Sequence, residues 1–184
     1  MNIRITHRWL LEFLDTKATP QEIQKYLSLS GPSIERIEET PGGDFIYDIE
    51  ITSNRVDTAS VIGIAREAAT ILTRFGIPAK FKPLKVEEPT LETTALPIEI
   101  QDSGLCTRVL GVVMDNVSVK PSEDYIVKRL EAAGIRSLNS LVDVTNYIMM
   151  EVGHPTHVFD YDRIASHKLI IRHAKDKEKI ETLS

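Results

Sequence analysis

The chain has 184 residues, of which 42% are hydrophobic and 27% are charged, and its formal net charge is −5 at pH 7. This length suits one domain or two small ones, and the composition is ordinary for a globular protein with a hydrophobic core. The acidic balance argues against a protein that coats nucleic acid non-specifically, although a local patch could still contact RNA. The single cysteine, Cys106, excludes an internal disulfide, and no apolar run approaches the roughly 18 residues of a membrane span. With no signal-peptide pattern at the start, we expect a cytoplasmic protein without a membrane partner.

Two helices are predicted near the start of the chain. A short strand pattern opens the sequence, and Thr6 is a suitable cap for the helix that follows. In the second helix Thr19 is the expected cap, Pro20 takes the first helical position, Glu22 closes a capping box and Gly31 ends the segment. The core face of the first helix would carry Trp9, Leu10, Phe13 and Leu14.

A hairpin and a third helix complete this part. Residues 33–39 and 45–52 flank the turn sequence "TPGGD", and the second of them alternates as a strand does, so we expect them to pair antiparallel. Asp57 or Thr58 is the expected cap of the third helix, which the Gly and Pro of "FGIP" bring to an end. These elements predict a small α+β domain over residues 1–80. One face of the third helix would carry Ile62, Ala65, Ala69 and Leu72.

A linker and a second α+β unit follow. The stretch "KPLKVEEPTLETTALP" is charged and contains three prolines, so we place a linker at residues 81–95 and a second domain at residues 96–184. Strands are expected in "LPIEIQD" and in "TRVLGVVMDNVSVK", and a hairpin is expected in "KLIIRHAKDKEKIETL". Ser184 would then leave an unpaired strand edge, from which we expect the natural protein to continue.

Two helices are predicted inside this second domain. The segment "PSEDYIVKRLEAAG" has Ser122 as its expected cap, acidic residues in its first turn and Gly134 at its end. The segment "SLVDVTNYIMMEVG" is expected to begin with a capping box formed by Ser140 and Asp143 and to end at Gly153.

Polar residues gather on and around the second of these helices. Thr145 lies on its apolar stripe, where its hydroxyl could bond to a carbonyl one turn earlier. Asn146 faces another direction and could be solvated or hold a ligand or a water. Arg136 suits either a surface charge or a phosphate contact, and His157 is by itself more often structural than catalytic. We predict no metal site, because His154 and His157 form a single HxxH pattern with Pro155 inside it and no cysteine nearby. We also find no nucleophile or phosphate-loop motif.

Longer strings point to a family. The strings "ITHRWLLEFLD", "DIEITSNRVDTASVIGIAREAA", "CTRVLGVV" and "LEAAGIRSLNSLVDVTNYIMMEVGHPTHVFDYDRI" resemble the bacterial β subunit of phenylalanyl-tRNA synthetase, in that family's order. The resemblance implies an N-terminal (B1-type) domain at 1–80 and the first part of a mixed α/β editing (B3/B4-type) domain at 96–184. It also implies that an OB-fold tRNA-binding domain, usual in bacterial relatives, is missing, with "TPGGD" in its place.

The resemblance further implies an activity. In that family the editing domain hydrolyses tyrosine wrongly attached to tRNA-Phe, and its pocket residues match Arg136, Thr145, Asn146 and His157 here. Asn146 and His157 would order a water or polarise the ester, Arg136 would hold the tRNA end, and Thr145 would shape the pocket. The glutamate that reads the tyrosine hydroxyl in the family would lie beyond Ser184.

The rest of the enzyme follows from the same resemblance. The complete ligase would be an α2β2 assembly with the α subunit, and it would charge tRNA-Phe using ATP and Mg²⁺, neither of which this stretch is expected to bind. The stretch alone is therefore not expected to aminoacylate. Two alternatives remain: a non-catalytic docking module for the α subunit or tRNA, and a standalone trans-editing or unrelated RNA-binding protein, against which "ITHRWL" and "ITSNRVD" argue.

Overall fold

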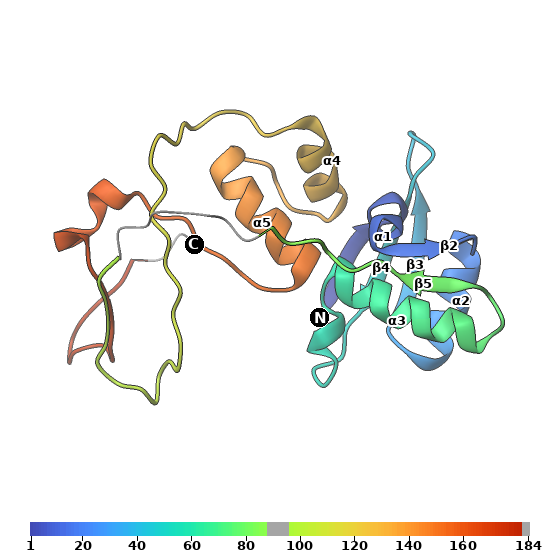
Figure 1. Ribbon diagram of the computed structural model, residues 1–184, viewed down its shortest axis with the longest axis horizontal. Coiled ribbons are helices and arrows are strands. Elements are labelled where there is room, and N and C mark those ends of the chain that lie inside the picture. Colours follow the sequence, from blue (N-terminus) through green and yellow to red (C-terminus); the bar gives the residue numbers. More distant parts are fainter. Residues whose placement is uncertain (88–95, 182–184) are drawn as a thin grey trace. The chain divides into compact units, whose positions relative to one another are not determined.

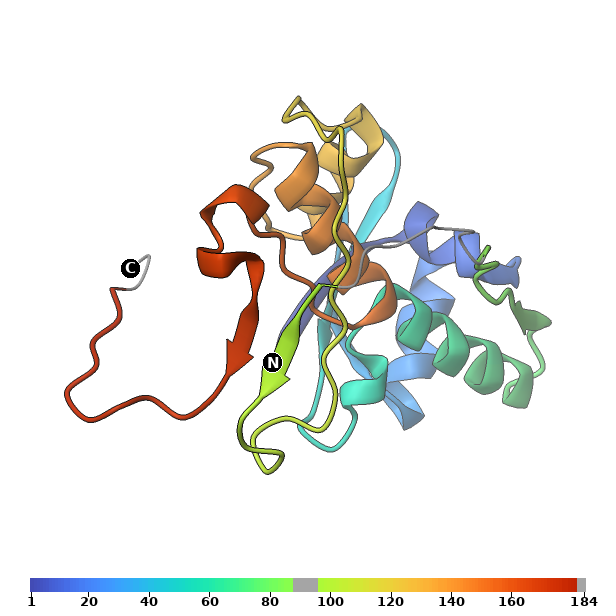
Figure 2. The same cartoon turned by 60° about the vertical axis from the view of Figure 1, so that its left-hand side comes forward.

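The computed structural model describes residues 1–87 and 96–181 (Figures 1 and 2). The chain divides into two units, of which unit 1 combines Met1–Glu87 with Val119–Val158. Unit 2 holds the described residues of Glu88–Ser118 and Phe159–Ser184. Helices and small sheets occur in the same chain, so the predicted α+β class is confirmed. The predicted domain boundaries at 80 and 95 stay a prediction.

Unit 1 is built on a three-stranded antiparallel sheet in the order β1 (Asn2–Thr6), β4 (Phe45–Glu50), β3 (Ser33–Glu39). The predicted hairpin of β3 and β4 is confirmed, and β1 pairs with the other edge of β4. Alternate side chains of β1 and β4 are buried, because successive residues of a strand point to opposite faces. The buried partners are Ile3 with Ile49 and Ile5 with Tyr47.

The first helix begins where the sequence predicts and ends one residue earlier. α1 (His7–Phe13) follows Thr6, whose hydroxyl oxygen accepts a hydrogen bond from the Trp9 N–H at 3.2 Å. The prediction that Leu14 belongs to this helix is wrong. Leu14 is buried but extended, because it begins β2 (Leu14–Thr16), which pairs antiparallel with β5 (Ala79–Phe81).

The second helix, α2 (Pro20–Ser30), has the predicted capping box. The Thr19 hydroxyl oxygen accepts from the Glu22 N–H at 3.2 Å, and the Glu22 carboxylate accepts from the Thr19 N–H at 2.8 Å. Gly31 ends the helix as predicted, and its N–H donates to the carbonyl of Leu27. Both ends of α2 are therefore set by residues within one turn.

The third helix, α3 (Val61–Arg74), begins later than predicted. Ser60 is its cap, with an oxygen that accepts from the Gly63 N–H at 3.0 Å, so the prediction of Asp57 or Thr58 is wrong. Both of those side chains instead bond to Arg55 within a short 3-10 turn that precedes the helix. Of the predicted face, Ala65 and Leu72 are buried and Ile62 and Ala69 are half-buried.

Two further helices belong to unit 1, α4 (Asp124–Ala132) and α5 (Ser140–Val152). The predicted cap of α4 at Ser122 is wrong, because Glu123 takes that position without a side-chain bond. The predicted capping box of α5 is also wrong. Its cap is Asn139, whose side-chain oxygen accepts from the N–H groups of the first turn. Gly153 ends α5 as predicted, with φ of +81°.

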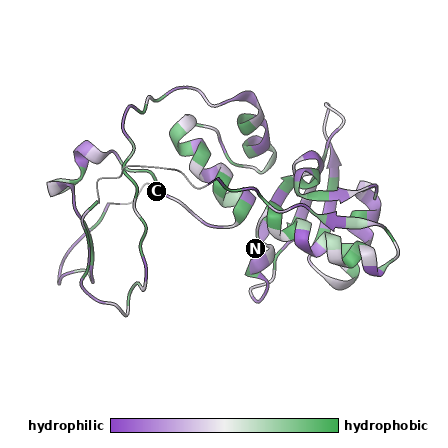
Figure 3. Ribbon diagram, in the orientation of Figure 1, coloured by the Kyte–Doolittle hydropathy of each residue, from purple (hydrophilic) through white to green (hydrophobic). Residues whose placement is uncertain are grey.

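The core of unit 1 gathers side chains from both parts of its sequence. α3 packs against α1, α2 and α5, and α4 contacts α5 and β1. Figure 3 shows hydrophobic residues on α3 and on α5. The largest fully buried side chains are Trp9, Tyr47, Ile5, Leu10, Leu14, Ile23, Leu27, Ile49, Ile64, Leu72, Leu130 and Val61.

Unit 2 contains a two-stranded parallel sheet of β6 (Ile98–Ile100) and β7 (Leu169–Ile171). The strand in "LPIEIQD" is therefore confirmed. The predicted hairpin in "KLIIRHAKDKEKIETL" is wrong for its described residues, because β7 pairs with β6 and not with the residues that follow it. The strands predicted at 107–120 are also wrong, since that segment has no ladder partner among the described residues. None of the helices in the described ranges is long and apolar enough to cross a membrane.

Candidate functional site

The four residues predicted to act together lie in and beside α5, in unit 1. Arg136 is exposed in the loop between α4 and α5, and Thr145 and Asn146 are half-buried on α5 itself. His157 is exposed in the segment that follows the helix. In the described part of the chain no hydrogen bond or ion pair joins Arg136, Thr145 and Asn146, so their roles stay a prediction.

The Thr145 hydroxyl makes the local bond that its helical position predicts. It donates to the carbonyl of Val142 at 2.7 Å, one turn earlier on α5. A hydroxyl has one hydrogen and two lone pairs, so the Thr145 oxygen can still accept a hydrogen bond from a ligand or a water. The side chain thus has a fixed orientation and an acceptor to offer.

A buried carboxylate holds the loop that carries Arg136 against the first turn of α5. The Asp143 side chain is fully buried. One of its oxygens accepts from the hydroxyls of Ser122 at 2.5 Å and Ser137 at 2.6 Å, and the other accepts from the Leu138 N–H at 2.8 Å. These bonds tie both ends of the α4 region to α5 and fix the backbone on either side of Arg136.

The charge of Asp143 is stabilised by the same contacts. Burial opposes ionisation and would raise its pKa, but the hydroxyls of Ser122 and Ser137 and the N–H of Leu138 outweigh burial. The pKa of Asp143 therefore lies below its ordinary value of 3.8. The sequence predicts this aspartate as the partner of Ser140 in a capping box. The serine upstream of α4 carried no signal that it would reach α5.

The end of α5 is fixed by a glycine. Gly153 has φ of +81°, a left-handed conformation that residues with a side chain rarely adopt. A Cβ at this position would lie 3.2 Å from the Cβ of Ser60, the residue that caps α3. The close approach sets the direction in which the chain leaves α5 toward His157.

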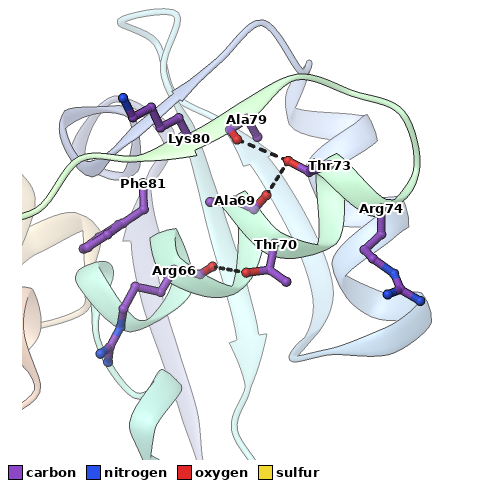
Figure 4. A pocket seen from close by; sticks show the side chains of 8 residues that line it. All are labelled: Arg66, Ala69, Thr70, Thr73, Arg74, Ala79, Lys80 and Phe81. Atoms are coloured by element: carbon purple, nitrogen blue, oxygen red, sulfur yellow. Dashed lines mark hydrogen bonds between the residues drawn. The ribbon is translucent and has the colours of Figure 1, made fainter.

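A second surface feature is an open groove between α3 and β5 (Figure 4). The Thr73 hydroxyl joins its two sides, since it lies 2.8 Å from the carbonyl of Ala69 on α3 and 3.2 Å from the carbonyl of Ala79 on β5. Three basic side chains extend around the groove in different directions (Figure 4). The lining residues are Arg66, Ala69, Thr70, Thr73, Arg74, Ala79, Lys80 and Phe81. The groove contains none of the four predicted site residues.

Comparison with known proteins finds relatives that share one name. Residues 105–184 match the model of the B3/4 domain. The chain is 42% identical over 157 residues to the phenylalanine–tRNA ligase beta subunit of Carboxydothermus hydrogenoformans, which covers 83% of this chain and 18% of that protein. Over most of its length the chain is similar to phenylalanine–tRNA ligase beta subunits.

Other relatives with the same name give a similar picture. The Clostridium acetobutylicum beta subunit is 45% identical over 140 residues, or 75% of this chain and 17% of that protein. The Rhodopirellula baltica beta subunit is 34% identical over 187 residues, or 97% of this chain and 26% of that protein. The chain thus spans between 17% and 26% of the length of these curated beta subunits.

The family predicted from sequence strings is confirmed. The structure also shows how the chain connects β3 to β4. β3 and β4 are joined by a tight turn, in which the Thr40 N–H donates to the carbonyl of Asp44 at 2.8 Å and Gly43 has φ of +65°. This turn occupies the place where the resemblance implied that an inserted domain is missing. In the described ranges, no group of three or more His, Cys, Asp or Glu side chains is arranged to hold a metal ion. The statement that the site uses no metal stays a prediction.

Proposed function

We propose that this chain is part of the β subunit of a phenylalanine–tRNA ligase and that α5 and its flanking loops contribute to the site that removes tyrosine from mischarged tRNA-Phe. The observation that carries the proposal is the 42% identity over 157 residues to a beta subunit of that name. The geometry supports it, because the loop of Arg136 and the helix of Thr145 and Asn146 are bound together through Asp143.

The reaction is hydrolysis of the ester between tyrosine and the terminal ribose. A water attacks the carbonyl carbon, the carbon–oxygen bond to the ribose breaks, and a proton is delivered to the leaving ribose oxygen. The Asn146 amide and the Thr145 oxygen orient the water and the ester, and the His157 imidazole accepts the proton of the attacking water. Arg136 provides a guanidinium for a phosphate of the tRNA end. No nucleophilic side chain takes part.

The charging reaction belongs, in this proposal, to the complete enzyme. The β subunit assembles with an α subunit as α2β2, and this assembly uses ATP and Mg²⁺ to attach phenylalanine to tRNA-Phe in the cytoplasm. The residues described for this chain contribute to proofreading and to assembly, not to the ATP site.

Deacylation of tyrosine-charged tRNA-Phe tests the proposal. The full-length subunit with its α partner is compared with His157→Ala and Arg136→Ala, and His154→Ala and Arg163→Ala are the matched controls. We expect rapid release of tyrosine, no release of phenylalanine, a rate lowered at least about tenfold by either site variant, and unchanged rates in the controls. A wild-type enzyme that leaves the tyrosyl ester intact would contradict the proposal.

A docking module is the second candidate, and the groove between α3 and β5 favours it. Arg66, Arg74 and Lys80 form no ion pair with any described carboxylate, so their charges are available to an anionic partner such as tRNA. If the groove binds tRNA, the double variant Arg74→Glu, Lys80→Glu weakens tRNA binding in a filter-binding assay, most strongly at low salt. Weakened binding together with an inactive wild type in the deacylation assay would favour docking over proofreading.

A further inference from the structure

The face of α5 that packs against α1 contains a buried acid. The Glu151 side chain is 8% exposed, and its carboxylate accepts a hydrogen bond from the Trp9 indole N–H at 2.8 Å. The two residues are 142 positions apart in sequence, and both belong to unit 1. This bond links the start of the chain directly to the last turn of α5.

Aromatic rings extend the same contact. The rings of Trp9 and Tyr147 are stacked, with centroids 4.7 Å apart and an angle of 25° between their planes. Tyr125 of α4 meets Tyr147 edge-on at 6.1 Å. Burial, together with the nearby charge of Glu151, raises the pKa of Tyr147, so its hydroxyl stays protonated in neutral solution.

An arginine from α4 completes the cluster. The Arg129 guanidinium lies 5.3 Å from the centroid of the Trp9 ring, donates to the Tyr147 hydroxyl and forms an ion pair with Glu12 of α1. Arg129 therefore contacts α1 and α5 at once. Together, Trp9, Tyr147, Arg129 and Glu151 form what we call the α5 anchor.

The α5 anchor fixes one face of the helix. Tyr147 and Glu151 are four residues apart and so share a face, which is turned toward α1. Asn146 and Thr145 precede Tyr147 by one and two positions, which rotates them by roughly 100° and 200° around the helix axis. A rotation or shift of α5 would therefore displace both side chains together.

We propose that Trp9, Arg129 and Glu151 are positioning residues for the proofreading site, because they set the rotation of α5 and thereby the placement of Thr145 and Asn146. This inference rests on the proposed function. A directional hydrogen bond specifies the rotation of a helix more strictly than apolar packing does, whereas apolar residues alone would be adequate for stability. A displacement of about 1 Å at a reacting centre lowers rates by up to about a hundredfold.

Three variants distinguish an effect on the placement of α5 from an effect on the stability of the fold. Glu151→Gln keeps an oxygen that accepts from the Trp9 N–H, Glu151→Leu removes the acceptor, and Trp9→Phe keeps an aromatic ring but removes the donor. Glu131→Leu, on the exposed side of α4, is the matched control. All are made in the full-length subunit with its α partner, and both kcat and KM are measured for release of tyrosine from tRNA-Phe.

We expect Glu151→Leu and Trp9→Phe to lower kcat about tenfold or more, with KM for the tRNA and the rate of phenylalanine charging each within about twofold of wild type. Glu151→Gln should keep kcat within about threefold, and the control should match wild type. An active wild type with an unchanged kcat in Glu151→Leu and Trp9→Phe would overturn the inference and leave the proposed function standing. An inactive wild type would overturn the proposed function, and the inference with it.

Discussion

The buried carboxylate of Asp143 gives the sharpest test of how α5 is held. Asp143→Ala removes the acceptor of three hydrogen bonds, from the hydroxyls of Ser122 and Ser137 and from the Leu138 N–H. Asp143→Asn is the more conservative change. Its oxygen can still accept from Leu138, and its amide N–H groups can donate to the two serine oxygens. The two variants should therefore differ strongly in stability.

The expected magnitudes follow from the number and kind of bonds. A hydrogen bond to a charged group contributes about 1.5–3 kcal/mol to stability, and the three bonds are not fully additive. We expect Asp143→Ala to lower the free energy of unfolding by about 4 kcal/mol. Asp143→Asn keeps three neutral bonds at about 1 kcal/mol each and loses only the contribution of the charge, so we expect a loss of about 1–2 kcal/mol.

Urea unfolding, followed by tryptophan fluorescence, measures this difference. Trp9 is the only tryptophan in the sequence, and it contacts Tyr147 and Glu151 of α5, so its emission reports on the packing of that helix. Asp15→Ala, at an exposed position of β2, is the control and should change little. Equal unfolding midpoints for Asp143→Ala and Asp143→Asn would refute the view that the three donors, and not the volume of the side chain, hold the loop.

Three further outcomes are expected from the same measurements. Thr19→Ala should lower the free energy of unfolding by about 1 kcal/mol, because it removes the cap of α2, and no change in the urea midpoint would contradict this. Gly63→Ala should destabilise by about 3 kcal/mol or abolish folding in the same unfolding assay, since a Cβ there would lie 2.3 Å from the Asp57 carbonyl oxygen. The folded-state pKa of Asp143 is below 3.8, so its charge stabilises the fold above that pH and the contribution is lost as the pH falls through the folded-state value. Urea titrations at pH 7 and below pH 3.8 should therefore show the difference between wild type and Asp143→Asn shrinking in acid.

Some interactions between residues within a few positions of each other were predictable from the sequence. The capping box of Thr19 and Glu22 was one case, and the bond of Thr145 to a carbonyl one turn earlier was another. The hairpin of β3 and β4 followed from alternation on either side of a Pro-Gly turn. The family, too, was readable from short strings, because they preserve residue types and spacing.

The partner that a polar side chain or a strand takes was not predictable in the same way. Several residues near helix starts could each serve as a cap, and the sequence does not say which of them has another partner. Ser140 and Asp143 were expected to form a capping box at the start of α5. Asp143 instead bonds to Ser122 and Ser137, and Asn139 is the cap. β7 was expected to form a hairpin with the residues after it, but it pairs in parallel with a strand about 70 residues earlier.

The sequence by itself therefore determined the positions of the helices, the hairpin of β3 and β4, the family and the identity of the polar residues around α5. Only the tertiary structure decided that α4 and α5 belong to one unit with residues 1–87, and that Glu151 bonds to Trp9. The reason is physical. The capping box of α2 and the turn between β3 and β4 are formed by groups that are neighbours in the chain, whereas a buried carboxylate bonds to whichever donor the packing of distant segments brings beside it.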